Sequence, residues 1–353
     1  MSNREPKLSQ RGTRSLDVKN GRVDMSHGAG GRAMAQLIED MFVAAFDNDL
    51  LKREHDAAMF RLPVGRVVMS TDSFVISPLF FPGGNIGSLA VHGTVNDISM
   101  AGAKPYYLTA GFILEEGFAL RDLAEIVKSM AAAAKDADVM IVTGDTKVVE
   151  RGHGDGIYIN TAGVGVVRDD IDICGDLAKP GDKVLINGTL GDHGVAVMSK
   201  RENLSFTTAL RSDSQSLADL VQDMVGAVPD IHVLRDPTRG GLAATLNEIA
   251  NQSGVGIELV ESTIPVRPEV KSACELLGLD PLYVANEGKL IAICPAEQAD
   301  ALLAVMKAHP KGRDGAIVGE VLKDSRCFVR MKTQLGGTRM VDWLAGEQLP
   351  RIC

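Results

Sequence analysis

The order of the apolar segments restricts the fold more than any other feature of this sequence. Two segments, 34–45 and 120–134, carry apolar residues at the spacing of an amphipathic helix. Shorter apolar runs predict strands at 67–71, 139–143, 157–167, 184–186, 290–294 and 317–322. Two more helices are predicted at 217–225 and 242–250. Because strands and helices mix without strict alternation, the pattern favours an α+β fold over a doubly wound sheet.

The chain length and one turn signal predict two domains. A chain of 353 residues is long enough for two ordinary domains. Lys179-Pro180-Gly181-Asp182 predicts a turn just before a new strand, so we place the boundary near residues 170–180. The expected organisation is a polar, mobile N-terminal extension (1–22), an N-terminal domain (23–170), a C-terminal domain (171–335) and a tail (336–353).

Charge and cysteine content exclude several classes of protein. The net charge of −9 argues against a protein that binds nucleic acid or a membrane surface through a basic face. The five cysteines are widely spaced and form no CxxC pair, which argues against a zinc knuckle and fits a reducing compartment. The polar N-terminus does not resemble a signal peptide, and no apolar run approaches the ~20 residues that span a bilayer. We therefore expect a cytoplasmic protein.

Four aspartates are predicted to lie at strand ends or in glycine-containing turns. They are Asp72, Asp97, Asp145 and Asp236. Magnesium prefers hard oxygen ligands and commonly binds a nucleotide through a few carboxylates together with phosphate oxygens. Carboxylates on four separate loops can form such a site if the fold brings them together. Each aspartate can also be a helix cap or a turn residue, and spacing alone does not separate these interpretations.

Other polar positions allow both a functional and a structural interpretation. The loop Gly28-Ala29-Gly30-Gly31 can lay backbone N–H groups against phosphates, or can be a flexible loop before a helix. Lys147 can neutralise phosphate charge or be a solvated surface lysine. Glu287 can act as a general base or occupy a turn. His193, close to two glycines at a predicted helix start, is interpreted as a hydrogen-bonded structural residue.

The chain ends in an unusual way, with Pro350-Arg351-Ile352-Cys353. Proline blocks helix and favours an extended backbone, so the last residues can form an arm that carries a thiol. The neighbouring Arg351 can favour the thiolate form of Cys353. The alternative is a frayed terminus in which the cysteine has no role, and the residues alone leave both interpretations open.

Taken together, these motifs closely resemble the HypE family of hydrogenase maturation proteins. That family belongs to the PurM-like superfamily of aminoimidazole ribonucleotide synthetase, together with selenophosphate synthetase and thiamine monophosphate kinase. The resemblance runs from about residue 24 to the last residue. It rests on these motifs: Ser26-His27-Gly28-Ala29-Gly30-Gly31, Thr71-Asp72-Ser73-Phe74, Asn96-Asp97-Ile98, Gly144-Asp145-Thr146-Lys147-Val148-Val149, Gly191-Asp192-His193-Gly194, Asp236-Pro237-Thr238-Arg239-Gly240-Gly241, Ala285-Asn286-Glu287-Gly288 and Pro350-Arg351-Ile352-Cys353.

The resemblance implies a two-domain α+β protomer with an ATP site between the domains. It further implies a homodimer formed by the N-terminal domains, a sandwich-like α/β C-terminal domain and a flexible tail. By the same resemblance, the residues expected to bind magnesium are Asp72, Asp97 and Asp236. Those expected to contact the nucleotide are Gly28, Gly30, Gly31, Asn85, Gly144, Asp145 and Thr146, although some relatives carry an aspartate where this chain has Asn85.

The implied reaction takes place on the last residue of the chain. A HypF-like carbamoyltransferase places a carboxamide on the sulfur of Cys353, and ATP then drives its dehydration to an S-cyanate. Lys147 stabilises the developing phosphate charge and Glu287 removes protons. The cyanate passes to a complex of HypC with HypD and becomes a cyanide ligand of the iron in [NiFe] hydrogenase.

Two other functions remain open from the sequence. A small-molecule synthetase or kinase of the same superfamily has no need of a terminal cysteine. Selenophosphate synthetases typically carry a reactive Cys or selenocysteine followed by Lys in the glycine loop, and this loop continues Gly31-Arg32 instead. A nucleotide-binding carrier that delivers the group without making it predicts no ATP turnover.

Overall fold

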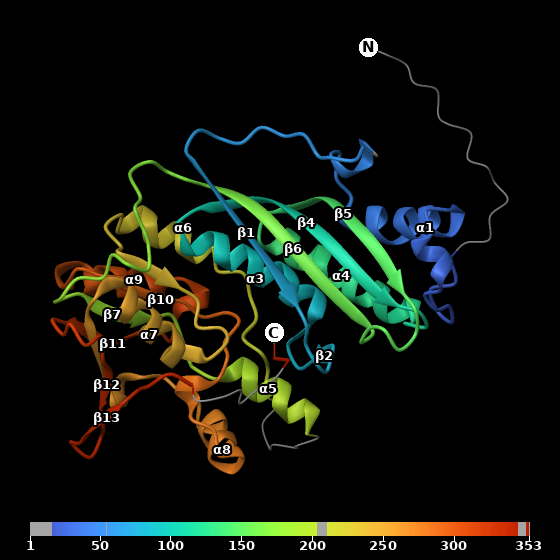
Figure 1. The fold of residues 1–353 in the computed structure, drawn as a ribbon. Helices are drawn as coiled ribbons and strands as arrows, with labels where there is room; N and C mark the ends of the chain where they lie inside the picture. Colours follow the sequence, from blue (N-terminus) through green and yellow to red (C-terminus); the bar gives the residue numbers. More distant parts are fainter. Residues whose placement is uncertain (1–15, 54, 203–209, 345–350, 353) are drawn as a thin grey trace.

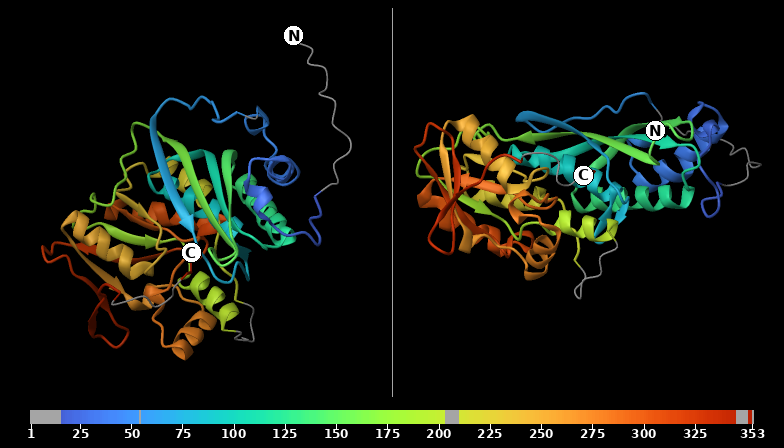
Figure 2. Two further views of the ribbon diagram at one scale, coloured as in Figure 1. Left: turned by 45° about the vertical axis from the view of Figure 1, so that its right-hand side comes forward. Right: turned by 60° about the horizontal axis from the view of Figure 1, so that its bottom comes forward.

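The computed structural model describes residues 16–53, 55–202, 210–344 and 351–352. Two domains lie side by side, each with its own sheet (Figure 1). Figure 2 shows the same arrangement from two further directions, with helix α5 (Asp192–Arg201) at the junction of the domains. In the described part of the chain, no helix has the length and apolarity needed to cross a bilayer.

In the described part of the chain, the N-terminal domain is built on a mixed four-stranded sheet. Its strand order is β1 (Arg66–Phe74), β6 (Ile157–Val167), β4 (Lys104–Glu115) and β5 (Met140–Val149), with β4 and β5 parallel and the other pairs antiparallel. Helices α3 (Ile86–Met100) and α4 (Leu120–Asp136) cover one face. A small hairpin, β2 (Phe80–Phe81) with β3 (Gly84–Asn85), leads into α3.

Shorter helices lie beside the β5 edge of this sheet. They are η1 (Met25–Gly28), α1 (Arg32–Leu37), η2 (Ile38–Val43), α2 (Ala44–Phe46) and η3 (Leu51–Arg53). The helix predicted over 34–45 is therefore present, with a π-helical segment at its centre. Its apolar face is buried through Leu37, Met41 and Phe42, as the spacing predicted.

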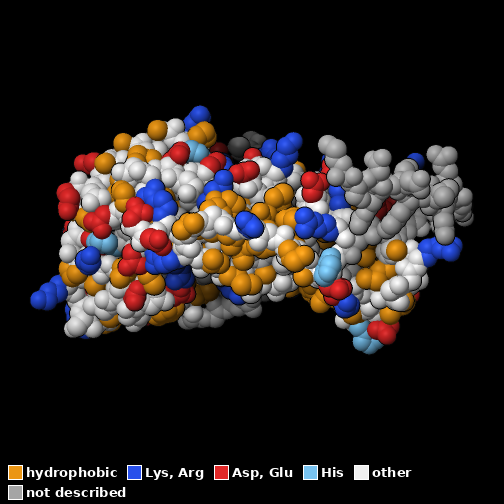
Figure 3. Space-filling view, turned by 90° about the horizontal axis from the view of Figure 1, so that it is seen from above, with side chains coloured by type: hydrophobic (Ala, Val, Ile, Leu, Met, Phe, Trp, Pro, Cys, Tyr) orange, Lys and Arg blue, Asp and Glu red, His pale blue; other side chains and the backbone are white. Residues whose placement is uncertain are grey.

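The other face of the N-terminal sheet is open and apolar. Residues that pair directly across strands share a face, and Met69, Val164, Tyr107 and Met140 form one such row. Exposed hydrophobic side chains on the face belong to β1, β4 and β5, and they are Val67, Met69, Ile113 and Met140. Figure 3 views this face and shows hydrophobic side chains gathered over its middle. A continuous exposed apolar surface of this kind marks a binding surface.

Among the described residues, the C-terminal domain has a seven-stranded sheet that lies between two layers of helices. The order is β13 (Thr338–Met340), β12 (Val329–Lys332), β9 (Gly256–Val260), β11 (Ala316–Leu322), β7 (Lys183–Ile186), β10 (Ile291–Cys294) and β8 (Val233–Arg235). One face packs against α6 (Ala218–Ala227) and α9 (Ala299–Ala308). The other packs against α7 (Gly241–Ser253). Helix α8 (Pro268–Leu277) packs on α5.

Short 3-10 helices complete this domain at η4 (Glu261–Thr263), η5 (Pro281–Tyr283), η6 (Ala296–Gln298) and η7 (Pro310–Gly312). The predicted helices and strands of both halves are confirmed within a few residues, and the α+β class with two domains is confirmed as well. The C-terminal domain was expected to be sandwich-like, and its sheet does lie between two layers of helices.

Several local predictions were wrong. Asp72 and Asp145 lie within strands β1 and β5 rather than at strand ends, because both strands continue beyond their apolar residues. Asp97 lies in helix α3, whose buried small and apolar residues resemble a loop or strand as much as a helix. Only Asp236 directly follows a strand, as predicted.

The chain ends also differ from expectation. Leu16 packs against the N-terminal core and Arg22 forms a β-bridge with Ala119, so residues 16–22 are part of the packed domain rather than of a mobile extension. Strand β13, within the predicted tail, adds to the C-terminal sheet and is followed by the buried Val341.

Candidate active site

Four acidic residues from four elements converge between the domains. Asp72 lies on the helix-covered face of β1, where its partner Thr161 is buried, and Asp97 lies on α3 behind that sheet. The C-terminal domain supplies the other two, Asp236 after β8 and Glu287 before β10. Strands β8 and β10 pair, and they bring residues 236 and 287 close together.

Hydrogen bonds hold the loops of this cluster in place. The backbone N–H of Asn286 donates to the carbonyl of Pro237 over 3.1 Å. Across the domain junction, Asn96 Nδ2 donates to the carbonyl of Glu287 over 3.3 Å. Ser70 Oγ donates to Asp97 Oδ2 over 2.8 Å. The carboxylates are therefore carried on loops and elements that are bonded to one another across both domains.

The acidic side chains of the cluster raise one another's pKa values. Burial raises the pKa of Asp97, and the charge of Asp72 raises it further. Burial and then the charge of Asp97 raise the pKa of Asp236 to about 7. Burial likewise raises the pKa of Asp72, and this rise is opposed by a backbone hydrogen bond from Ser73 and by the nearby Arg239. Mutual repulsion of this kind is relieved when a cation binds.

Glu287 is the most deeply buried acid of the cluster, with 4% of its surface exposed. Burial raises the pKa of its carboxyl well above the usual range, and the charges of Asp236 and Asp213 add to this rise. Its Oε1 atom is buried without a hydrogen-bond partner among the described residues. A carboxyl group with a raised pKa and one oxygen without a partner is suited, once ionised, to accept a proton from a substrate.

The turn after β8 depends on two glycines. Gly240 and Gly241 have φ values of +78° and +62°, a region that side chains other than glycine rarely adopt. The turn places Arg239 where its charge acts on Asp72. Sequence reasoning missed Arg239 as a member of the site, although it stands inside the quoted Asp-Pro-Thr-Arg-Gly-Gly motif.

A second group of predicted residues lies at the β5 edge of the N-terminal sheet. Lys147 Nζ lies 2.7 Å from Asp145 Oδ2, and the hydrogen bond from Lys147 lowers the pKa of this aspartate. The loop of Gly28 packs on Val148, next to Lys147. Gly30 and Gly31 face open space, so their backbone can be approached by a ligand. These residues form one local group.

Packing explains some of the predicted residues without a ligand. A Cβ atom on Gly144 would collide with the carbonyl oxygen of Ala110 on the adjacent strand. Asn85 is the N-cap of α3, and its Oδ1 accepts hydrogen bonds from the N–H groups of Gly87 and Ser88 at 2.8 and 3.3 Å. Contact of either residue with a nucleotide stays a prediction.

An apolar cavity of about 100 Å³ adjoins this second group. Gly144, Asp145 and the buried Thr146 line one side of it. The other walls come from α1, η2, α2, β4 and β5 and include Met34, Ile38, Phe42, Phe46 and Phe112. The cavity is small, and its lining is mostly apolar, as the lining of small-molecule sites is.

The two groups do not meet within one protomer. Strands β1 and β5 form opposite edges of the sheet, so residues in the same row are about 14 Å apart at the usual spacing of strands. Lys147 and Asp145 also point to the open face, whereas Asp72 points to the helix-covered face. The condition that all four aspartates meet is therefore not fulfilled within one protomer, because Asp145 lies apart from the other three.

The end of the chain enters the junction between the domains. Ile352 is buried, with 2% of its surface exposed, and its carbonyl oxygen lies 2.8 Å from His193 Nε2. The carbonyl of Arg351 accepts hydrogen bonds from the Ser77 N–H at 3.2 Å and from the Arg201 guanidinium at 2.9 Å, and the side chain of Arg351 pairs with Asp155. Cys353, the predicted substrate carrier, lies outside the described residues.

The prediction that His193 is a hydrogen-bonded residue is confirmed, and one of its two partners is the tail. Sequence reasoning missed this contact because the two residues are far apart in the chain. Within residues 16–53, 55–202, 210–344 and 351–352, no three His, Cys, Asp or Glu side chains are arranged to hold an ion. Asp72, Asp97 and Asp236 thus do not form a preassembled metal cage.

Comparison with known proteins shows the family of this chain. Residues 54–167 match the family model of the AIR synthase related protein, N-terminal domain, and residues 179–332 match that of the C-terminal domain. The carbamoyl dehydratase HypE of Azotobacter vinelandii is 65% identical over 338 residues, which cover 96% of this chain and 99% of that protein. The chain belongs to the HypE family.

Solved structures of HypE proteins extend this comparison. A crystal structure of the hydrogenase maturation protein HypE in complex with ATP matches with a TM-score of 0.90 at 52% identity, covering 93% of this chain and 99% of that one. A crystal structure of a HypE–HypF complex matches with a TM-score of 0.77 at 52% identity, covering 87% of this chain and 99% of that one. The family's PurM-like two-domain fold is confirmed.

Proposed function

We propose that this HypE family member uses ATP to dehydrate an S-carboxamide on Cys353 to an S-cyanate, the source of the cyanide ligand of [NiFe] hydrogenase. The observation that carries this proposal is the buried position of Ile352, directly before Cys353 in the sequence. Its carbonyl is bound by His193, and the neighbouring Gly194 N–H bonds the carbonyl of Ala285, two residues before Glu287. The chain end therefore enters the junction that contains the acidic cluster.

The chemistry requires an activated oxygen and a base. An amide oxygen is a poor leaving group, so transfer of a phosphoryl group from ATP to that oxygen is needed before it can depart. Loss of phosphate together with the nitrogen protons then leaves the nitrile. Glu287 is the proposed base, because its buried carboxyl has a raised pKa and an Oε1 atom without a partner. Lys147 is the proposed cation that stabilises charge on the phosphate.

The acidic cluster suits magnesium bound together with phosphates. Asp72, Asp97 and Asp236 repel one another, and they do not form a closed cage among the described residues. Magnesium commonly takes one or two carboxylates, waters and phosphate oxygens, rather than a site made of protein alone. We therefore propose these three aspartates as the magnesium ligands; the ion neutralises phosphate charge when bound.

The nucleotide site is proposed to be completed by a second copy of the chain. Gly144, Asp145 and Thr146 line the apolar cavity, which offers a place for part of an adenine base. The loop of Gly28, Gly30 and Gly31 packs on the nearby Val148. They lie on the sheet edge away from the acidic cluster. Pairing of two N-terminal domains through their open apolar faces covers Met69 and Ile113 and brings Lys147 into a shared interface.

The proposed partners follow the family. A relative has been crystallised as a HypE–HypF complex. We propose that a HypF-like carbamoyltransferase loads Cys353 of this chain and that a HypC–HypD complex accepts the cyanate, in the cytoplasm. Both exchanges require the tail to leave the junction, because Ile352 is buried there.

Intact-mass spectrometry of the full-length protein tests this function. The chain is incubated with a HypF-like carbamoyltransferase and its carbamoyl donor, and ATP with magnesium is then added. We expect a carbamoyl group on Cys353, followed by the loss of one water when ATP is present. Cys353→Ala should block both changes, whereas the matched control Cys174→Ala, at an exposed cysteine elsewhere, should block neither. A tail that stays unmodified in the wild-type protein would contradict the proposal.

A further inference from the structure

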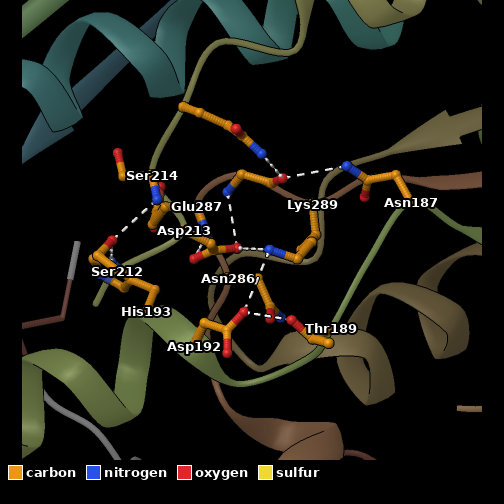
Figure 4. A network of polar contacts seen from close by, with 12 residues as sticks. Asn187, Thr189, Asp192, His193, Ser212, Asp213, Ser214, Asn286, Glu287 and Lys289 are labelled. Carbon is orange, nitrogen blue, oxygen red and sulfur yellow. Dashed lines mark hydrogen bonds and ion pairs between the residues drawn. The ribbon is translucent and has the colours of Figure 1, made fainter. Parts of the chain in front are cut away.

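A short segment between the domains, Ser212–Gln215, touches both the tail anchor and the loop of Glu287. We call this segment the strap. The N–H of Ser212 donates to the Pro82 carbonyl over 2.8 Å, and Ser214 Oγ lies 2.9 Å from His92 Nδ1, so the strap is bound to the N-terminal domain. Figure 4 shows its side chains between His193 on one side and Glu287 and Lys289 on the other.

On one side, Asp213 holds the backbone that carries Glu287. Its carboxylate accepts hydrogen bonds from the N–H groups of Glu287 at 3.3 Å and Gly288 at 3.2 Å, and from Lys289 Nζ at 2.8 Å. A Cβ atom on Gly288 would collide with the Asp213 carbonyl oxygen. The strap therefore packs directly on the Glu287 loop, and no side chain separates them.

On the other side, Ser212 and His193 form a directed chain of hydrogen bonds to the tail. The Ile352 carbonyl can only accept, so His193 Nε2 must carry the proton in the 2.8 Å contact. Burial lowers the pKa of His193, which keeps the ring neutral, and Nδ1 is then an acceptor. The Ser212 hydroxyl, 2.8 Å from Nδ1, must donate to it, and Ser212 Oγ accepts from the Ser214 N–H at 3.0 Å.

The imidazole has little freedom to turn away from this arrangement. His193 has none of its surface exposed, and the ring of Phe81 meets it edge-on at 5.4 Å between centroids. The Ile352 carbonyl, which can only accept, selects the tautomer that presents an N–H to the tail, and the Ser212 hydroxyl then donates to Nδ1. A tautomer with the proton on Nδ1 would leave the buried Ile352 carbonyl facing an acceptor, which is costly.

We propose that His193, Ser212 and Asp213 are positioning residues of the dehydration, which hold the penultimate carbonyl of the tail and the backbone of Glu287 in one fixed relation. This inference rests on the proposed function above. Asp213 fixes the position of the proposed base, Glu287. The Ser212–His193 pair fixes the peptide group between Ile352 and Cys353. The carboxamide is thereby presented to Glu287 only when the tail is docked.

Two substitutions of His193 provide the first test. In His193→Gln the side-chain amide nitrogen reaches the place of Nε2 and can donate to Ile352, whereas the shorter His193→Asn cannot reach it. Docking is measured as the rate at which iodoacetamide alkylates Cys353, relative to the exposed Cys174 of the same molecule. Loss of a buried hydrogen bond should raise this rate about tenfold in His193→Asn, while His193→Gln stays within about threefold of wild type.

The same variants are assayed for dehydration in single turnovers with carbamoylated protein, followed by mass. We expect His193→Asn to slow the loss of water about tenfold without weakening ATP binding, and His193→Gln to restore most of the rate. A smaller change, Ser212→Ala, should shift both measurements in the direction of His193→Asn. Ser199→Ala is the matched control on α5, because its hydroxyl bonds only the Val195 carbonyl of its own helix.

Asp213→Asn tests the other side of the strap. It should slow dehydration while leaving Cys353 alkylation within about threefold of wild type, because its amide still fills the same space but binds the Glu287 loop less strongly. If folded His193→Asn and Ser212→Ala proteins alkylate and dehydrate like wild type, the positioning role is refuted. If wild-type protein itself loses no water with ATP, the proposed function fails instead, and alkylation still reports whether His193 anchors the tail.

Discussion

Replacing Lys289 by methionine should destabilise the protein strongly, because this lysine is the cation of a buried charge cluster. Lys289 Nζ lies 2.8 Å from Asp213 Oδ2 and 3.7 Å from Asp192 Oδ2. The side chains of the three residues are 7%, 4% and 2% exposed. Removing one partner of such a buried pair costs about 3–5 kcal/mol, since the carboxylates keep their desolvation cost without compensation. We expect a loss in this range at pH 8.

The pH dependence of this loss has a defined sign. Burial is the largest single effect and opposes ionisation of Asp213. The charge of Lys289, a smaller effect of His193 and the hydrogen bonds from Lys289 and the Glu287 N–H together outweigh it, so the pKa of Asp213 lies below its ordinary value. Asp213 therefore stabilises the wild-type fold above the pKa that it has in the unfolded chain, and this contribution disappears as the pH falls. In Lys289→Met the carboxyls can escape the penalty by taking up protons. The difference between variant and wild type should shrink from pH 8 to pH 5.

Urea unfolding measures the effect through the fluorescence of Trp343, the single tryptophan of the chain, which lies in the C-terminal domain. A double variant, Lys289→Met with Asp213→Asn, should lose clearly less than the sum of the two single variants, because the same pair is broken in both. A loss below about 1 kcal/mol, or one that does not change with pH, would refute the assignment of a buried ion pair.

Three further outcomes are expected. Glu287→Gln should slow dehydration of carbamoylated protein by about 10²–10⁴-fold with ATP affinity retained, and a variant that keeps its single-turnover rate would remove Glu287 as the base. Burial, with a smaller effect of Lys311, lowers the pKa of His92 to about 4, so the unfolded chain binds more protons below its ordinary value near 6.5. The free energy of unfolding should then fall by about 1.4 kcal/mol from pH 7.5 to 5.5, and His92→Gln should lose this slope in urea titrations. Met69→Asp, on the open sheet face, should convert a dimer to a monomer in light scattering, and an unchanged mass would place the interface elsewhere.

Local patterns were sufficient for the elements of the fold. Helix α4 and strand β6 could be predicted because spacing of apolar residues reports directly which face is buried. Helix α3 could not be classified around Asp97, because almost all of its residues are buried and the helical period is therefore absent. The same reasoning placed Asp72 at a strand end, although β1 continues to Phe74.

The candidate site could be predicted in its residue types and only partly in its arrangement. Asp236 and Glu287 were assigned from motifs, and the pairing of β8 with β10 brings them together. Lys147 and Asp145 were assigned to the same site, but the strand order carries them to the far edge of the sheet and its opposite face. Strand order and face depend on pairings between distant segments, which local spacing does not encode.

The amino-acid order alone determined the class of fold, the acidic and glycine motifs and the thiol at the chain end, since each depends on neighbouring residues. Only the folded chain decided that His193 meets the carbonyl of Ile352, 159 positions away, and that Asp213 supports the Glu287 loop. These contacts form because polar groups buried between the two domains lose water and must hydrogen-bond to one another. That requirement arises only after both domains have packed.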